Sequence, residues 1–323
     1  MAKKLPKREL KVEVVADEKP EAAHAKRSPS TAKNREQCPG FTPRNEESAW
    51  SAEGTKLHRY MELFVTARSD GKTKVEMHEI EKDFSDEQRE QIQKLCDFIE
   101  PFFPTTEKIQ CEVKLDLRSL DLPGCDFGTA DLVLVHPGNV VHAFDYKFGK
   151  VEVDDAQDNA QAQIYALGIF AMFPDCQQVD FHILQPRLDQ VSHGSFKRSG
   201  IAELKLRAKV IFERCESLDP LTLQAFSVRA GVEGPLALDS SLNPQANLCE
   251  YCSLIGTCPA VAKFALRVTP GPEMPEEIVP DMVKDDPAKL SSLFQWAKLL
   301  EAKGNALQDQ INDLARSGNE VEG

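Results

Sequence analysis

Apolar residues recur every three or four positions over residues 46–67, and this spacing predicts an amphipathic helix. A second helix is predicted over residues 85–103, because Ser85 is a typical N-cap residue and a proline near the far end disfavours continuation. Two further helical patterns cover residues 154–173 and 200–218. The first of these two carries acidic residues in its predicted opening turn, where the helix dipole favours negative charge.

Four stretches with strand-like alternation or short apolar runs are predicted to be β-strands, namely residues 108–119, 128–135, 139–148 and 178–186. The first three follow one another directly, which predicts a meander. The fourth is separated from them by a helix and is followed by another. This order predicts a mixed α/β fold, in which helices flank a central sheet.

The composition changes towards both ends of the chain. Residues 1–35 hold ten Lys/Arg and five Asp/Glu and few aromatic residues, which predicts a disordered basic tail. Residues 36–265 have the apolar content of one folded domain. The proline-rich residues 266–287 are typical of a linker, and residues 288–323 predict a C-terminal helical segment.

Charge and cysteine content limit the classes of function. The net charge of −13 counts against a large nucleic-acid groove, although an acidic body can carry a small basic channel. The chain has no run of 18 apolar residues and no apolar segment of signal-peptide type near its start, so we expect a cytoplasmic protein without a membrane span. Nine cysteines in such a chain favour reduced thiols or a metal site over disulfides.

Two aspartates stand inside the apolar runs of the stretch GTADLVLVHPGNVVHAFDYKFGK, residues 128–150. If residues 137–139 form the loop of a hairpin, Asp131 and Asp145 face each other across the two strands. Opposed carboxylates in buried strands are unfavourable unless one is protonated or a cation lies between them, and Mg²⁺ or Mn²⁺ suits oxygen ligands. The alternative is that one aspartate faces solvent at a strand end.

Three nearby features favour a site. Lys147 lies two residues after Asp145 and therefore on the same face of the strand, although such a lysine is often a plain salt-bridge partner. Gln161 and Tyr165 share one helix face, or they are a surface glutamine beside a core tyrosine. His58 is a candidate neutral ligand, although a lone histidine is more often structural.

The sequence CEYCSLIGTC contains Cys249, Cys252 and Cys258, a cluster that needs a fourth ligand to complete a metal site. Zinc and an iron–sulfur cluster both remain open from this spacing. The other single cysteines are expected to be buried thiols; they are Cys96, Cys111, Cys125, Cys176 and Cys215.

Taken in order, these motifs resemble the PD-(D/E)XK nuclease superfamily and, within it, the RecB-like branch. The matching elements are a helical histidine, an aspartate after a GT-D strand start, a D-x-K strand and a Q-x-x-x-Y helix. The stretches around them are still more similar to a family of phage and prophage proteins of this branch that has no assigned function. The resemblance covers roughly residues 28–265 and implies a restriction-endonuclease-like core.

The resemblance implies a Mg²⁺- or Mn²⁺-dependent phosphodiesterase. The implied ligands of one or two ions are His58, Asp131, Asp145 and the backbone carbonyl of Tyr146. Lys147 would position the attacking water, and Gln161 and Tyr165 would contact the DNA strand or brace the site. Glu112, in the preceding strand, is a looser match for a ligand of a second ion.

In iron–sulfur members of the branch, which include AddB-type and CRISPR adaptation nucleases, one upstream and three downstream cysteines hold a [4Fe–4S] cluster. The resemblance therefore implies Cys38 as the fourth ligand beside Cys249, Cys252 and Cys258. Zn²⁺ is the alternative occupant. We expect this cysteine site to join the two ends of the domain.

The implied function is that of a DNA nuclease, preferably an exonuclease, in phage recombination, repair or end processing in a bacterial host cell. The alternative is a non-cleaving or partner-dependent module that binds DNA or protein through a nuclease fold. Implied partners are DNA and a phage single-strand annealing protein or a helicase. The sequence contains no G-x-x-x-x-G-K-[ST] motif, so any unwinding would depend on a partner.

Overall fold

The computed structural model describes residues 25–44, 49–67, 73–218, 242–256, 258, 260–261 and part of 294–316. The described residues form two compact units. The first comprises the segment up to Lys33 together with residues 49–212, and the second comprises residues 34–44 together with the described residues from Glu213 onwards. No helix within the described ranges combines the length and apolar character needed to cross a membrane.

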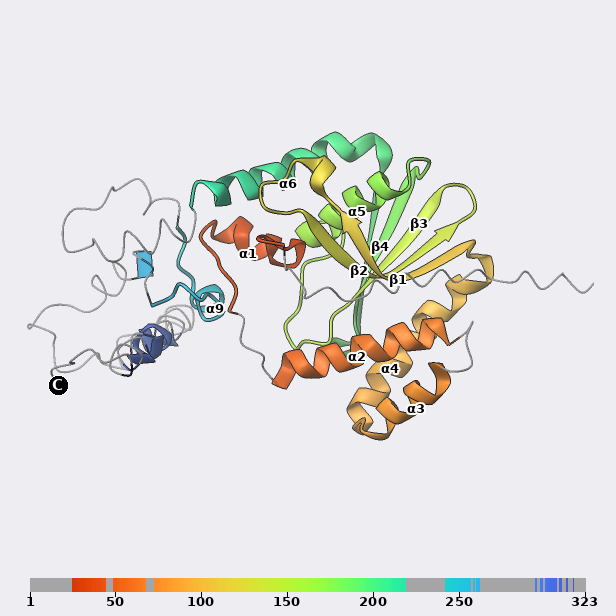
Figure 1. The fold of residues 1–323 in the computed structure, drawn as a ribbon, viewed down its shortest axis with the longest axis horizontal. Coiled ribbons are helices and arrows are strands. Elements are labelled where there is room, and N and C mark those ends of the chain that lie inside the picture. Colours follow the sequence, from red (N-terminus) through yellow and green to blue (C-terminus); the bar gives the residue numbers. More distant parts are fainter. Residues whose placement is uncertain are drawn as a thin grey trace, which may run out of the picture. The chain divides into compact units, whose positions relative to one another are not determined.

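The first unit contains a five-stranded sheet whose strands follow one another in chain order (Figure 1). The strands are β1 (Lys108–Asp116), β2 (Phe127–His136), β3 (Val140–Tyr146), β4 (Gln178–Gln185) and β5 (Gln190–Lys197). Neighbouring strands are antiparallel except for β3 and β4, which are parallel. The fold is therefore mixed α/β, as the sequence predicts.

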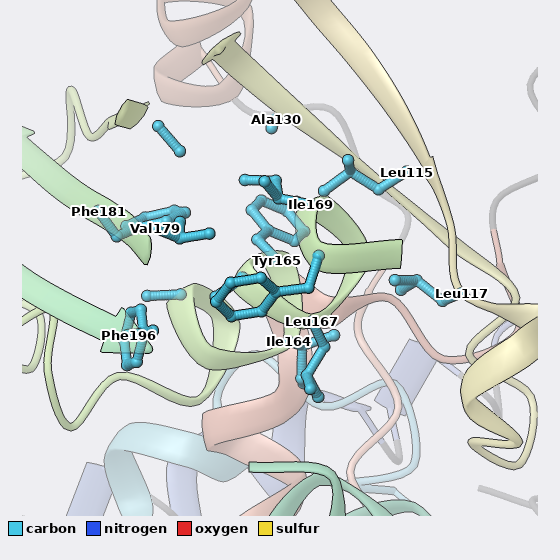
Figure 2. Close-up of a cluster of buried hydrophobic side chains, with 14 of the residues drawn as sticks. Leu115, Leu117, Ala130, Ile164, Tyr165, Leu167, Ile169, Val179, Phe181 and Phe196 are labelled. Atoms are coloured by element: carbon cyan, nitrogen blue, oxygen red, sulfur yellow. The ribbon is translucent and has the colours of Figure 1, made fainter. Parts of the chain in front are cut away.

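Helices cover both faces of the sheet (Figure 1). One face carries α5 (Ala160–Met172), and α6 (Ile201–Glu216) adds side chains to the same apolar cluster. Figure 2 shows Tyr165 and Ile169 of α5 inside that cluster. The other face carries α2 (Ala49–Thr66) and α4 (Asp86–Ile99), whose apolar residues pack on β1, β2 and β3. Burial of these two apolar layers is the main stabilising contribution in the unit.

The predicted N-cap of α4 is confirmed. The Ser85 side chain accepts from the Gln88 backbone N–H, and the Gln88 side chain accepts from the Ser85 backbone N–H, which together make a capping box. A 3₁₀ helix, η2 (Glu100–Thr105), continues from α4. The segment between α2 and α4 also contains α3 (Thr73–Lys82), which the sequence did not predict.

The start of α5 differs from the prediction. The helix begins at Ala160 and has no acidic residue in its first turn, so the predicted acidic opening turn is wrong. The Asn159 side chain is the N-cap and accepts from the backbone N–H of Ala162 at 3.1 Å. The preceding aspartates have other partners: Asp154 pairs with Lys33 at 2.5 Å, and Asp155 accepts from Ser192 Oγ at 3.1 Å.

The predicted basic tail, residues 1–35, overlaps the first segment that the structure describes. Residues 25–35 belong to it by composition, yet η1 (Pro29–Thr31) and α1 (Ala32–Gln37) lie in this region, and Arg27 and Ala32 are buried. Residues 1–24 of the tail and the predicted linker 266–287 lie outside the described residues. The described positions between 294 and 316, which fall in the predicted C-terminal helical segment, are helical.

The second unit is built largely from loops around the cysteines. Its short helix α9 (Ala246–Cys249) leads into a series of turns, and an isolated β-bridge joins Pro43 to Cys252. Two small apolar clusters surround these turns, and the second includes Ala302 and Ala306 from the C-terminal helical positions.

Candidate active site

The β2–β3 hairpin has the register that the sequence predicts. Residues 137–139 form the turn, with Gly138 and Asn139 at φ of 84° and 63°. The paired residues run from His136↔Val140 to Leu132↔Phe144, so the next positions along the same register are Asp131 and Asp145. At this point the Tyr146 backbone N–H donates to Asp131 Oδ2 at 2.6 Å. The two aspartates therefore lie at the end of the hairpin ladder.

Asp145 is held in a closed set of three side chains. Its carboxylate is 4% exposed and contacts Lys147 Nζ through Oδ2 at 2.8 Å. Gln161 Nε2 donates to Asp145 Oδ1 at 3.0 Å, and Lys147 Nζ donates to Gln161 Oε1 at 3.1 Å. Burial lowers the pKa of Lys147, but the adjacent Asp145 carboxylate outweighs burial and leaves the pKa raised. Lys147 is therefore a cation at neutral pH.

Asp131 belongs to a second group, with His58 and Glu112. His58 Nδ1 lies 3.5 Å from Asp131 Oδ1, and one ligand atom from each of the three residues lies within 4.8 Å of the other two. Burial raises the pKa of Asp131 to about 6, and the neighbouring Asp145 adds to the rise. A buried carboxylate of this kind is stabilised in its charged form by a cation.

Glu112 owes its place in the group to an unusual backbone conformation. It stands between the pairs Cys111↔Leu132 and Val113↔Ala130, across from Asp131, and has φ of 48°. The left-handed region costs a non-glycine residue roughly 1–2 kcal/mol, and such strain is concentrated at functional sites. The strand pattern of the sequence contains no signal for this backbone conformation.

The donor set fits a divalent cation. One imidazole nitrogen and two carboxylates suit Mn²⁺ or Mg²⁺ better than a soft ion. The structure brings together His58 and Asp131 from the predicted ligands and adds Glu112, whereas Asp145 faces Lys147 and Gln161. Tyr146 contributes its backbone N–H to Asp131, and its buried hydroxyl has no hydrogen-bond partner among the residues that the structure describes.

Tyr165 lies within the core beneath the site. It is 4% exposed, and burial, followed by the charges of Asp145 and Asp131, raises its pKa. A Cβ on Gly128 would lie 2.6 Å from its ring, so the glycine of the GT-D motif makes room for this side chain. Of the two predicted roles for Tyr165, burial favours bracing the site over contact with DNA.

The four predicted cysteines meet in the second unit. Cys38, Cys249, Cys252 and Cys258 line one pocket whose other lining residues are mostly apolar. Burial raises the pKa of Cys249 to about 12, with Cys258, Cys252 and Cys38 contributing. Unliganded thiolates are therefore unfavourable here, and a bound metal would stabilise them.

Backbone hydrogen bonds join the two distant segments that carry these cysteines. The Arg44 N–H donates to the Tyr251 carbonyl at 3.1 Å, and the Ser253 N–H donates to the Thr42 carbonyl at 2.8 Å. The other five cysteines are buried single thiols, as predicted.

Comparison with known protein families matches residues 24–323 to a family described as "Protein of unknown function (DUF2800)". The match covers nearly the whole chain, and the protein therefore belongs to this family. The description of the family carries no activity.

Proposed function

We propose that this protein is a metal-dependent deoxyribonuclease that hydrolyses phosphodiester bonds. The observation that carries the proposal is that two groups of side chains, Asp145–Lys147–Gln161 and His58–Glu112–Asp131, lie at the same end of the hairpin, where Asp131 and Asp145 are the next positions along its register. This arrangement is consistent with the restriction-endonuclease-like core and RecB-like motifs that the sequence resembles.

His58, Glu112 and Asp131 would hold the cation. A divalent ion bound there would polarise the phosphate and make a water molecule more acidic. Lys147 keeps its proton beside Asp145, so its ammonium group can donate to a phosphate oxygen as negative charge develops. Gln161 orients both Asp145 and Lys147 through its amide, and it fixes their spacing before DNA binds.

The test uses end-labelled single-stranded and duplex DNA of each polarity, incubated with the full chain and Mn²⁺. We expect release of short products, and we expect Lys147→Met to reduce the rate by about a thousandfold, since it removes a charge aimed at the reacting group. Lys82→Met is the matched control, because Lys82 is exposed on α3 and pairs with Glu79. Equal rates for wild type and Lys147→Met would overturn the proposal.

A partner-dependent activity is the second candidate, and the net charge of −13 favours it. An acidic body binds DNA weakly unless a partner supplies the basic surface. A single-strand annealing protein or a helicase from the same phage is the expected partner. Cleavage that appears only after addition of such a partner would favour this second reading.

For the cysteine site we propose a [4Fe–4S] cluster, with Zn²⁺ as the alternative. The four cysteines line one pocket whose other walls are mostly apolar, which suits a buried metal site. The resemblance, with one upstream and three downstream cysteines, favours the iron–sulfur cluster over zinc.

Metal and sulfide analysis of anaerobically purified protein separates the two occupants. We expect a brown protein with iron and acid-labile sulfide at about four each per chain, as the [4Fe–4S] composition requires. A colourless protein with one zinc per chain would refute the cluster.

A further inference from the structure

Arg187 joins three elements of the first unit at the edge of the candidate active site. It lies in the 3₁₀ helix η4 (Pro186–Leu188), directly after β4. Its guanidinium contacts Glu53 of α2 and Glu87 of α4, each at 3.0 Å, and the side chain is 7% exposed. A charge buried to this extent is tolerated when it is paired, so these contacts constrain all three elements.

The contact to Glu53 acts on the helix that carries His58. Glu53 lies five residues before His58 in α2, and it also accepts from Gln88 Nε2 of α4 at 2.9 Å. Both contacts fix the same part of α2 against its neighbours. The imidazole of His58 then packs edge-on against Phe148 at 5.1 Å between ring centroids and reaches Asp131.

Strand β4, which Arg187 follows, is hydrogen-bonded to β3, the strand that carries Asp145. β4 runs parallel to β3 with Tyr146 opposite Leu184, and the Lys147 N–H donates to the Leu184 carbonyl at 2.9 Å. Arg187 follows Leu184 by three residues. Arg187 therefore connects the end of the sheet at which Asp145 lies to α2, the helix that carries His58.

We propose that Arg187 is a positioning residue that, through Glu53 and α2, places His58 for binding of a divalent cation. The proposal rests on the cation site of the proposed function and extends it to a residue without any contact to the ion. Residues that orient metal ligands typically change metal affinity by 10- to 100-fold when they are replaced.

Lys94 of α4 offers a matched control, because it contacts residues in and directly after η4. Lys94 of α4 contacts Asp189 at 2.5 Å and donates to the Pro186 carbonyl at 3.4 Å. Lys94 also pairs with Glu90 of its own helix at 2.8 Å. These contacts join α4 to the end of β4, and none of them involves α2. Lys94→Met therefore removes a more exposed connection to the same region without loosening the helix that carries His58.

The experiment measures Mn²⁺ binding to the full chain by calorimetry without DNA, after the cysteine site has been loaded. We expect Arg187→Met to weaken Mn²⁺ binding by about tenfold, Glu53→Gln to weaken it in the same direction, and Lys94→Met to leave it unchanged. Glu53→Gln keeps the shape of the side chain, so it tests the connection even if Arg187→Met unfolds. Wild-type affinity in Glu53→Gln, or an equal loss in Lys94→Met, would overturn the proposal.

A second arm tests whether Arg187 acts through His58. In a His58→Ala background, the addition of Arg187→Met should cause no further loss of Mn²⁺ affinity, whereas a general weakening of the fold would cause the same loss in both backgrounds. If Mn²⁺ binding follows this pattern but the protein cleaves no DNA, the proposed nuclease activity is refuted and the positioning role of Arg187 stands. A wild-type chain that binds no Mn²⁺ would overturn the positioning role together with the cation site.

Discussion

The carboxylate site and the cysteine site differ in what holds them together. At the carboxylate site, Asp145, Lys147 and Gln161 satisfy one another, and the hairpin register sets their spacing. At the cysteine site, residue 38 meets residues 249–258 through loops, and its thiols face mostly apolar neighbours. The first is arranged by its own hydrogen bonds and ion pair, whereas under the proposed function the second would depend on a bound metal for its stability.

The largest expected effect follows from loss of the cysteine-bound metal. Structural metal binding contributes on the order of 10 kcal/mol to small metal domains, so Cys249→Ser should unfold the second unit and leave the first unit folded. The chain has two tryptophans, Trp50 in the sequence of the first unit and Trp296 in that of the second. Variants with one tryptophan replaced by phenylalanine report on each unit separately in urea unfolding.

The matched control for that experiment is Cys215→Ser, which replaces another buried cysteine of the second unit. We expect it to leave the Trp296 transition in place. Simultaneous loss of both tryptophan transitions in Cys249→Ser would show that the two sites are not independent in stability.

The next effect concerns the carboxylate site. Asp145→Asn keeps the shape of the side chain but removes the charge that pairs with Lys147, and we expect DNA cleavage to fall at least a hundredfold. Because Lys147 keeps its hydrogen bond to Gln161 and is 27% exposed, the Trp50 transition should move by only about 1–2 kcal/mol. A loss of folding as large as that in Cys249→Ser would contradict the contrast between the two sites.

A smaller effect is expected at the glycine that makes room for Tyr165. In Gly128→Ala the added Cβ would lie 2.6 Å from the tyrosine ring and 2.9 Å from Pro29. Since both neighbours are held by the core, the substitution should lower the free energy of unfolding of the first unit by about 2–3 kcal/mol. Gly138→Ala is unsuitable as a control because of its φ of 84°, so Gly149→Ala, which has open space around it, serves instead. An unchanged urea midpoint in Gly128→Ala would show that Tyr165 can shift.

The parts of the fold that the sequence predicts are those with strong local signals. The three-residue loop at residues 137–139 predicts the observed β2–β3 register, and Ser85 marks the start of α4. The strand β5 is exposed along much of its length, so its pattern gave no apolar signal. The start of α5 was misplaced because Asp154 and Asp155 bind elsewhere, and only Asn159 caps the helix.

The residues of the candidate site also differ in whether a local sequence signal predicts their positions. His58 lies on α2 and Asp131 on β2, both within elements that the sequence predicts. Gln161 lies on α5, whose start differs from the prediction, and Lys147 follows the end of β3. Glu112 and Arg187 depend on contacts between distant segments, one through a left-handed backbone and the other through a salt bridge spanning 134 residues. Local periodicity carries no information on such contacts.

The smallest expected effect is a pH dependence confined to the first unit. Burial, with His142 and His193 contributing, lowers the pKa of His182 to about 3, and the pKa values of His142 and His136 are lowered as well. His182 Nε2 lies 3.1 Å from His142 Nδ1, and Asp180 lies beside His193 at 3.6 Å. The folded state therefore keeps His182 neutral, whereas the unfolded chain takes up a proton below its ordinary pKa of about 6.5. The stabilising contribution is complete above that pH and is lost progressively as the pH falls towards 3.

Between pH 7 and pH 5 the free energy of unfolding of the first unit should fall by about 2 kcal/mol from His182, at 1.36 kcal/mol per pKa unit. All seven histidines lie at or before residue 193, in the sequence of the first unit, so the Trp296 transition should lack this dependence.

His182→Phe should flatten the pH dependence of the Trp50 transition, because it removes the titrating imidazole. Phenylalanine can keep the stacking on Phe144 that His182 makes at 4.8 Å. Replacement of the exposed His78 by phenylalanine should leave the slope as it is in wild type. An unchanged slope in His182→Phe would mean that other groups carry the acid sensitivity of the first unit.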